Sequence, residues 1–240
     1  MPREIRIVLV ETSHPGNIGA AARAMKTMCL ERLVLVKPAA FPHPDATARA
    51  SAATDVLDQA EVVPNLDTAL AGCALVAGTS ARRRGIGPVN MPPRAAVAEL
   101  MAIAADQDVA VVFGRERTGL TNEELDRCNL HLGIPANPEY ASLNLAAAVQ
   151  IVAYEFMLAC ATPQAATPAS VPLATADEME GLYAYLESAA LDSGFLDPAN
   201  PRQLMRRLRH LFGRAQPDQN EINILRGLLK ALQASSTGNT

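Results

Sequence analysis

The sequence predicts an α/β fold with a mostly parallel sheet, followed by a small all-α domain. Short, almost uninterrupted apolar runs such as Ile5–Val10 are typical of strands that are buried on both faces of a parallel sheet. Segments with helical periodicity separate these runs, and strands that alternate with helices indicate an α/β fold. Residues 161–174 contain three prolines and no charge, and three amphipathic segments follow them. We therefore expect an α/β domain at residues 1–160, a linker at 161–174 and a helical domain at 175–234.

The α/β domain is expected to consist of strands that end in turn-rich loops and of helices between them. Short apolar runs predict the strands Ile5–Val10, Leu33–Val36, Glu61–Val63, Ala74–Ala77, Val109–Phe113 and Leu130–Ile134. Helices are predicted where apolar residues recur at helical spacing, as they do at Val97, Leu100 and Ala104. The predicted helices are Ala20–Met28, Asp45–Ala53, Asp67–Ala71, Pro92–Ala105 and Ser142–Cys160.

The predicted helix Ser142–Cys160 is apolar around almost its whole circumference. A helix without a polar face has to be covered on most of its sides. Two arrangements provide that cover: the helix lies between the sheet and a second subunit, or it is the central core helix of a monomer. The first arrangement predicts a homodimer.

The helical domain is expected to contain three helices. Each is amphipathic, with apolar residues on one face. Capping signals or an early proline mark the three starts: Thr175 with Glu178, Asn200-Pro201, and Asp218 with Glu221.

Composition and charge exclude several classes of protein. The formal net charge is −4, so any contact with nucleic acid has to come from local basic patches. The N-terminus lacks the features of a signal peptide, and no apolar segment suits a membrane span, so a cytoplasmic protein is expected. The four cysteines lie far apart and the four histidines show no ligand spacing, which predicts reduced thiols and no metal site.

Three common functional patterns are missing. Gly16 and Gly19 are only a fragment of the dinucleotide fingerprint, and no acidic residue follows at the position that would bind a ribose. This argues against a nicotinamide-dependent dehydrogenase, which the α/β pattern alone would suggest. The sequence also lacks a P-loop and a G-x-S-x-G motif, so neither nucleoside triphosphate hydrolysis nor a serine hydrolase is supported.

Two loops that follow predicted strands are expected to form the walls of one pocket. Gly114–Leu120 follows the strand Val109–Phe113, and Pro135–Ala141 leads from the next strand towards the long apolar helix. In open α/β sheets, ligands bind outside the carboxyl ends of the strands. Glycines allow the backbone to approach a ligand closely, and the start of a helix offers unpaired N–H groups.

Three motifs give the chain a family resemblance: Asn17-x-Gly19-x-x-x-Arg23, Phe113-Gly114-Arg115-Glu116-x-x-Gly119-Leu120, and Ile134-Pro135 followed by Ser142-Leu143-Asn144-Leu145. In order and context they resemble the motifs of the SPOUT-class RNA methyltransferases. Within that class the chain is similar to the bacterial tRNA (cytidine/uridine-32-2'-O)-methyltransferase family. The resemblance implies S-adenosyl-L-methionine as cofactor, tRNA as substrate, and methylation of the ribose 2'-hydroxyl of the pyrimidine at anticodon-loop position 32. Another tRNA or ribosomal RNA site, and a non-catalytic RNA-binding role, are the alternatives.

The resemblance also implies the SPOUT fold. In this fold about Val109–Cys160 threads into a trefoil knot, a feature that is nearly absent from other proteins. Two subunits pack through the knot, in agreement with the predicted homodimer. Carried over by position, the cofactor contacts fall on Thr79, Ser80, Ala81, Gly114, Gly119, Leu120, Ile134, Ala141, Ser142 and Leu143. Asn144 is expected either to cap the following helix or to touch the substrate.

The resemblance makes Arg23, Ser142 and Asn17 the catalytic candidates. Because arginine stays charged at any working pH, we interpret Arg23 as an electrostatic positioner, with Ser142 or a substrate phosphate as proton acceptor. Asn17 is expected to orient its loop or Arg23. Glu116 has two interpretations: a negative charge near the cationic sulfonium, or an ion pair that holds the Arg115 loop together.

Arginines are expected to bind RNA phosphates in spite of the negative net charge. Such clusters also occur as ordinary solvated surface. The candidates are Arg82 and Arg84 after the proposed cofactor loop, Arg206 and Arg207 in the helical domain, and Arg115. The loop Arg84–Met91 departs from the family pattern and lacks its aromatic residue, so its substrate contacts stay open.

Overall fold

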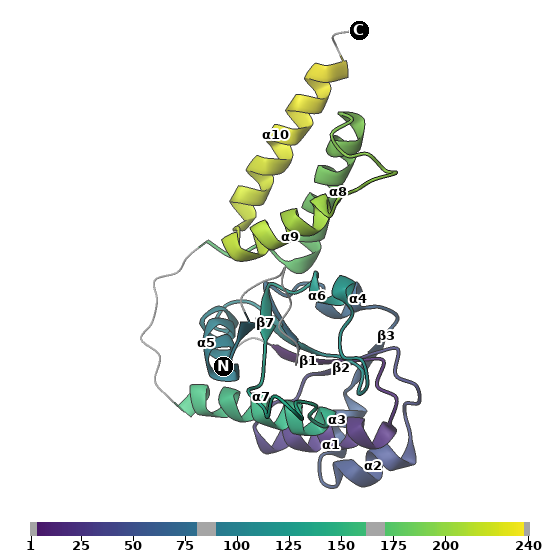
Figure 1. Ribbon diagram of the computed structural model, residues 1–240. Coiled ribbons are helices and arrows are strands. Elements are labelled where there is room, and N and C mark those ends of the chain that lie inside the picture. The colour runs from purple at the N-terminus through teal and green to yellow at the C-terminus, as the bar shows by residue number, and fades with distance from the viewer. Residues whose placement is uncertain (1–3, 81–89, 162–170, 238–240) are drawn as a thin grey trace.

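The computed structural model describes residues 4–80, 90–161 and 171–237, which form an α/β sheet domain and a group of C-terminal helices (Figure 1). Within these residues the sheet has seven strands in the order β3-β2-β1-β6-β4-β7-β5, and every neighbouring pair is parallel. The predicted α/β fold is therefore confirmed. The strands are β1 (Ile5–Val10), β2 (Leu33–Val36), β3 (Glu61–Val63), β4 (Leu75–Thr79), β5 (Asn90–Met91), β6 (Val109–Phe113) and β7 (Leu130–Leu132).

Helices cover both faces of the sheet. One face packs against α1 (Pro15–Thr27), α2 (Pro44–Ala50), α3 (Thr54–Asp58), α5 (Pro93–Ala104) and α7 (Leu145–Ala161). The other face packs against α4 (Leu66–Leu70) and α6 (Asn122–Leu125). Because both faces are covered, the strands need no polar side, which explains their continuous apolar sequences. No helix in the described part of the chain is long and apolar enough to cross a membrane.

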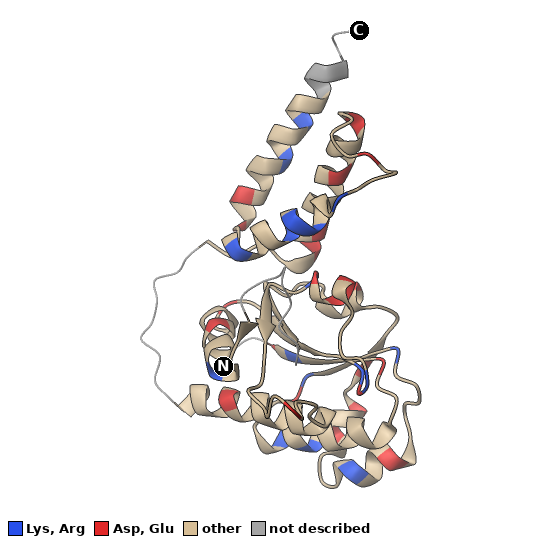
Figure 2. Cartoon of the chain, viewed as in Figure 1, with Lys and Arg blue, Asp and Glu red and all other residues tan. Residues whose placement is uncertain are grey.

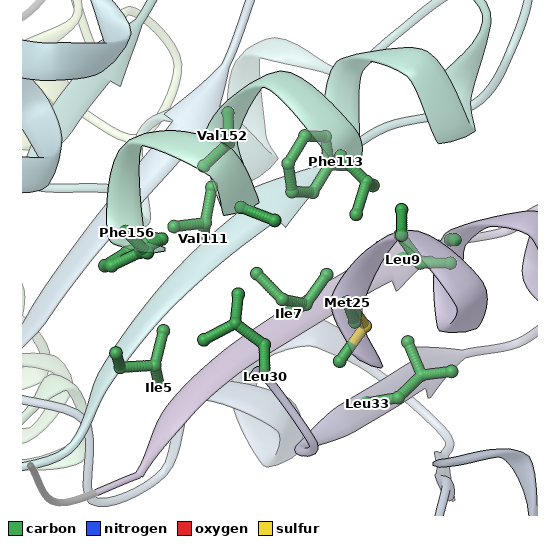
Figure 3. Packing of buried hydrophobic residues seen from close by; sticks show 14 of the residues in the cluster. Ile5, Ile7, Leu9, Met25, Leu30, Leu33, Val111, Phe113, Val152 and Phe156 are labelled. Carbon is green, nitrogen blue, oxygen red and sulfur yellow. The ribbon is translucent and has the colours of Figure 1, made fainter. Parts of the chain in front are cut away.

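The larger core lies between the sheet and the helices α1 and α7. Figure 3 shows Val111 of β6 close to Val152 and Phe156 of α7, and Ile7 of β1 near Met25 of α1. Burying one such side chain stabilises the fold by about 1.5–3 kcal/mol relative to leaving it exposed. This packing fixes both helices against the sheet beside the ends of its central strands.

The helix α1 begins earlier than the sequence pattern predicts. It starts at Pro15 rather than at Ala20, because proline suits the first turn of a helix, where its missing N–H costs nothing. Gly19 therefore lies inside α1, and a Cβ at this position would collide with the backbone of Ala46 in α2. Gly19, which precedes the predicted helix Ala20–Met28, thus lies at a contact between two helices.

Four further segments differ from the prediction. The predicted helix Asp45–Ala53 is shorter in the structure: α2 ends at Ala50, because Ser51 adopts a positive φ of 53°, and a separate helix, α3, begins at Thr54. The strand β7 ends at Leu132 rather than at Ile134, and β4 runs on to Thr79. The short strand β5 is additional.

The C-terminal helices share an apolar core of their own. Both predicted capping arrangements are present: the Thr175 N–H donates to Glu178 at 2.8 Å, and Asp218 and Glu221 exchange backbone-to-carboxylate hydrogen bonds of 2.9 and 2.8 Å. The second helix starts at Leu204, three residues after Pro201, and therefore later than the predicted start at Asn200-Pro201. The helices are α8 (Ala176–Asp192), α9 (Leu204–Ala215) and α10 (Gln219–Thr237).

The described end of the predicted linker is attached to the sheet domain. Leu173 donates its N–H to Gln107 Oε1 and accepts from Gln107 Nε2, both at 2.8 Å. Its neighbour Ala174 is buried. Residues 162–170 of the linker lie outside the described residues. The residues that follow this segment therefore connect the helical group to the sheet domain.

Candidate active site

A cavity of about 360 Å³ lies at the carboxyl ends of β4, β6 and β7. Its walls are the strand ends, the loop that follows β6, and the segment that leads from β7 into α7. Of the ten predicted cofactor contacts, Ala81 lies outside the described residues. The other nine all line the cavity: Thr79, Ser80, Gly114, Gly119, Leu120, Ile134, Ala141, Ser142 and Leu143. The structure thus brings these residues together, while their contact with a cofactor stays a prediction.

The cavity has further walls that the motifs did not single out. Leu132 at the end of β7 and Ala148 in the first turn of α7 add apolar surface. The only feature of the sequence that could have indicated these residues is that they lie near motif residues. Among the residues that the structure describes, no group of His, Cys, Asp or Glu side chains could hold a metal ion.

The loop after β6 folds tightly back on itself. The Gly119 N–H donates to the Arg115 carbonyl at 2.9 Å, and Gly119 adopts a positive φ of 68°, which glycine tolerates without steric strain. Gly114 lies so close to Gly119 and Leu120 that a Cβ on Gly114 would collide with their backbone. Both glycines of this motif are therefore required by the shape of the loop.

Arg115 anchors this loop from inside the protein. Its guanidinium donates to Glu124 at 2.9 and 3.0 Å and to Glu11 at 2.9 Å. The hydrogen bonds to Glu124 and then to Glu11 raise the pKa of Arg115 above its usual value. The side chain is 22% exposed. Arg115 is one of the predicted RNA contacts, but two carboxylates of the protein already compensate its charge.

Glu116 holds the start of α1 at the edge of the cavity. Its carboxylate accepts from the N–H and Oγ of Ser13 at 3.1 and 3.0 Å, from the His14 N–H at 3.2 Å, and from Asn17 Nδ2 at 3.0 Å. Burial opposes ionisation, but the hydrogen bonds outweigh it and lower the pKa of Glu116 to about 2. Within the described chain Glu116 makes no ion pair with Arg115, so that interpretation is wrong.

Asn17 connects this carboxylate to the start of α7. Its Nδ2 donates to Glu116, while its Oδ1 accepts from Asn144 Nδ2 at 3.1 Å. Asn144 Oδ1 accepts a backbone N–H of the first turn of α7 at 2.9 Å and so caps the helix, as one of its two interpretations predicted. For this reason α7 begins at Leu145 and not at Ser142. One chain of hydrogen bonds therefore joins the three motifs.

The catalytic candidates lie in different places. Ser142 is exposed in the wall of the cavity. Arg23 is exposed on α1 and does not line the cavity, and its side chain makes no hydrogen bond or ion pair within the described part of the chain. The structure thus leaves the guanidinium of Arg23 open to an external anion.

The predicted RNA-binding arginines also differ in their surroundings. Arg206 donates from Nε to Asp126 at 3.0 Å, and its side chain is 24% exposed. Arg207 is exposed and has no partner among the described residues. Arg82 and Arg84 lie outside the described residues.

Comparisons with known proteins agree with this geometry. Residues 4–154 match the SpoU rRNA Methylase family, and residues 177–240 match the C-terminal domain of the tRNA methyltransferase TrmJ. The tRNA (cytidine/uridine/adenosine-2'-O-)-methyltransferase TrmJ of Pseudomonas aeruginosa is 53% identical over 98% of this chain and 95% of its own length. The chain belongs to the TrmJ family. The tRNA (cytidine/uridine-2'-O-)-methyltransferase TrmJ of Cronobacter sakazakii is 50% identical, with 98% of both chains covered.

Solved structures show the same TrmJ-family architecture. The crystal structure of TrmJ from Z. mobilis ZM4 has a TM-score of 0.84 and 34% identity, and the match covers 97% of this chain and 99% of that one. A probable methylase family protein from Haemophilus influenzae Rd KW20 is 41% identical, with a TM-score of 0.65 and complete coverage of both chains. The resemblance that the three motifs predicted is therefore confirmed at the level of the family.

Proposed function

We propose that this protein transfers the methyl group of S-adenosyl-L-methionine to the ribose 2'-hydroxyl of the pyrimidine at position 32 of the tRNA anticodon loop. The observation that carries the proposal is the meeting of the three motifs around one cavity in a TrmJ-family chain. Relatives in this family are named for 2'-O-methylation of cytidine and uridine in tRNA, and one of them also for adenosine. Since the acceptor hydroxyl belongs to the ribose, the chemistry itself does not depend on the base.

The cavity suits S-adenosyl-L-methionine in size and lining. Its volume of about 360 Å³ falls within the usual range for small-molecule pockets, roughly 300–1,000 Å³. Leu120, Ile134 and Leu143 offer apolar surface for an adenine ring, and Glu116 adds a negative charge that suits a cation. When bound, this cofactor would supply an electrophilic methyl group on its sulfonium.

The residues of the chain then have to position the ribose and help remove a proton from its hydroxyl. Ser142 lies in the cavity wall, where its hydroxyl is available to accept a hydrogen bond or pass on this proton. Arg23 remains cationic and is proposed to bind a substrate phosphate and stabilise the developing alkoxide. Asn17 holds the start of α1, the helix that carries Arg23, against Asn144.

The exposed face of α7 supports the proposed homodimer. One side of the helix packs on the sheet, while Tyr154 and Met157 on the other side are 49% and 41% exposed. An apolar patch of this kind is typical of a subunit interface. We infer that a second copy covers it and that the segment Val109–Cys160 is knotted. Tyr154→Glu should convert the dimer into a monomer in light scattering, and an unchanged mass would contradict this interface.

The proposal also divides the chain into a methyltransferase domain at residues 1–160 and a helical domain at 175–234 that assists tRNA binding. The two family matches, 4–154 and 177–240, fall on either side of the linker at 161–174 and support this division.

Methyl transfer from labelled S-adenosyl-L-methionine to unmodified tRNA transcripts tests the activity, with the product located by mass spectrometry. Transcripts with cytidine, uridine or adenosine at position 32 report the base preference. A 2'-O-methyl pyrimidine at position 32 is the expected result. A methyl group found elsewhere in tRNA, or in ribosomal RNA, would show that the target is not position 32. Cofactor binding without any transfer would favour the non-catalytic RNA-binding role.

The variant Arg23→Ala tests the role of this arginine. Transfer should fall by at least about a hundredfold, the scale of positioned acid–base and electrostatic groups, with cofactor affinity nearly unchanged. Loss of cofactor affinity measured by calorimetry would show instead that Arg23 supports the cofactor cavity.

A further inference from the structure

The helix α9 carries two kinds of arginine that the sequence does not distinguish. Figure 2 shows its basic residues beside acidic segments where the helical group meets the sheet domain. Arg206 pairs with Asp126, directly after α6, and Arg209 pairs with Glu180 of α8, whereas Arg207 and Arg214 are exposed and have no ion-pair partner among the described residues. Positions 207 and 214 are seven residues apart, so they lie on one face of the helix.

The inner pair of arginines belongs to an ion-pair cluster at the junction. Arg206 Nε donates to Asp126 Oδ1 at 3.0 Å. Arg209 donates through both terminal nitrogens to Glu180, and its Nη2 lies 2.8 Å from the carboxylate. Glu180 also accepts from Arg127 of the sheet domain at 2.5 Å. A carboxylate of α8 is thus shared between α9 and the sheet domain.

Packing supports the same junction. The guanidinium of Arg209 lies 4.3 Å from the ring centroid of Tyr183, a cation–π contact. Gly213, one turn further along α9, is buried and lies against the backbone of Asn129. The first turn of α8 is fixed as well, since the Ala176 N–H donates to the Cys73 carbonyl at 2.8 Å and Asp177 accepts from the Gly72 N–H at 3.0 Å.

The junction is connected to the cavity through the short helix α6. Glu124 in α6 holds Arg115 of the cavity loop, and Asp126, directly after α6, holds Arg206 of α9. Two carboxylates only two residues apart therefore fix the cavity loop on one side and the helical group on the other. The position of α9 relative to the cavity depends on this piece of chain.

We propose that Arg206 and Arg209 are positioning residues that dock the helical group on the methyltransferase domain, and that Arg207 and Arg214 contact RNA phosphates. This assignment rests on the proposed tRNA methyltransferase function. Arg206 already neutralises Asp126, so its binding to a phosphate would first cost the loss of that pair. Arg207 and Arg214 have no such pair to break, and they gain a full charge-assisted contact.

The variants Arg206→Gln and Arg207→Gln form a matched pair, because they make the same change at neighbouring positions. Arg207→Gln should weaken tRNA binding and reduce the slope of log affinity against log salt by about 0.7–0.9, the value for one lost phosphate contact. Arg206→Gln should weaken tRNA binding with the slope unchanged. It should raise KM for tRNA more than it lowers kcat, with cofactor affinity unchanged.

The variant Asp126→Asn should change tRNA affinity in opposite directions for the two possible roles of Arg206, docking and phosphate binding. If Arg206 docks α9 through Asp126, Asp126→Asn weakens tRNA binding as Arg206→Gln does, and the double variant is no worse than either single one. If Arg206 binds phosphate, removal of the competing carboxylate frees its charge and tightens tRNA binding. Tighter binding, or a reduced salt slope in Arg206→Gln, would overturn the assignment.

Hydrogen exchange of the full-length protein without RNA tests the docking role separately. The backbone amides of α9 should exchange roughly tenfold faster in Arg206→Gln and in Asp126→Asn, and at the wild-type rate in Arg207→Gln. Unchanged exchange in the first two variants would overturn docking by this pair. Because no RNA is present, this experiment tests docking independently of methyl transfer. If methyl transfer to tRNA is not found, the proposed function is refuted, and the docking result still holds.

Discussion

The two loops that wall the cavity are built in different ways. In the loop after β6, Arg115 and Glu116 are each held by several charged or charge-assisted hydrogen bonds, and a capping box at Thr121 ends the loop. In the segment after β7, the backbone turn at Asn137 is supported by two hydrogen bonds of 3.0 Å, and Tyr140 is 79% exposed. We infer that the first wall is fixed before any ligand binds, while the second adjusts to the ligand.

The difference follows from the residues that each loop contains. Hydrogen bonds to charged groups contribute about 1.5–3 kcal/mol each, roughly twice the value of neutral ones. Two of the three charged residues in the first loop, Arg115 and Glu116, have partners directly after β1, in α1 and in α6, so the loop is tied to separate elements. The segment from Pro135 to Ala141 has one charged residue, Glu139, which is exposed. Hydrogen bonds of charged residues therefore order the first wall but contribute little to the order of the second.

The largest expected effect is that of Gly114→Ala. Its Cβ would collide with the backbone at Gly119 and Leu120, and relief of the collision has to move the whole first wall. Overpacking of this kind costs about 1–3 kcal/mol, so cofactor affinity should fall at least roughly tenfold in calorimetry. As a control, Gly227→Ala in α10 meets no atom within 4 Å and should stabilise the protein by about 0.5–1 kcal/mol. Normal cofactor binding by Gly114→Ala would show that the first wall is not rigid.

The variant Glu116→Gln should have the next largest effect. It removes the negative charge that four donors share, and at pH 7 the free energy of unfolding should fall by about 1.5–3 kcal/mol in urea titrations. The folded-state pKa of Glu116, about 2, lies below the ordinary value of 4.5. The stabilisation is therefore fully present above pH 4.5 and is lost as the pH falls towards 2.

A pH series and a matched variant test this prediction. The difference in unfolding free energy between wild type and Glu116→Gln should be smaller at about pH 3.5 than at pH 7. Glu139→Gln makes the same change in the second wall, and it should alter stability by less than about 0.5 kcal/mol at either pH. Equal effects of the two variants would remove the distinction between the walls.

The variant Asn144→Ala should have a moderate effect, since Asn144 lies where the two walls meet. It removes the cap of α7 and the hydrogen bond to Asn17, and loss of a cap costs about 0.5–2 kcal/mol. Thermal unfolding should show this loss, and methyl transfer should fall more than cofactor affinity because the start of α1 loses its hydrogen bond to Asn144. A variant with wild-type stability would mean that water replaces the cap.

The smallest effect on stability is expected for Tyr140→Ala in the second wall, less than about 0.5 kcal/mol, because the side chain is 79% exposed. The same wall should respond most to the ligand. On saturation with S-adenosyl-L-methionine, hydrogen exchange should slow at residues 135–143 and change little at 114–121. Equal slowing in both segments would show that both walls become ordered on binding.

Local sequence rules predicted six of the seven described strands, and the family resemblance predicted nine residues that line the cavity. Ile5–Val10 and Val109–Phe113 have the predicted bounds because a strand that is buried on both faces leaves a continuous apolar run. The strand β5 left no such signal, since Asn90 and Met91 are too few to show a period and prolines lie on both sides. The start of α1 was missed because proline and glycine also suit a turn.

The partners of charged residues could not be predicted from one sequence. Arg206 and Asp126 are separated by 80 positions, and Glu116 and Asn17 by 99. Neither separation leaves a local pattern, so Arg206 looked like the exposed Arg207 beside it. Only the three-dimensional contacts distinguish an arginine that holds the protein together from one that faces solvent.

The strand order has a consequence for how the chain folds during synthesis. Among the strands that the structure describes, β4 pairs with β6 and β7, which both follow it in the chain, while β1, β2 and β3 can pair as soon as they emerge. At about 5–20 residues per second, the 34 positions from Thr79 to Phe113 take roughly 2–7 s to synthesise. For that time β4 is a nascent strand without a neighbour. The arrival of β6 joins the two halves of the sheet, and the residues translated immediately afterwards are those of the first cavity wall.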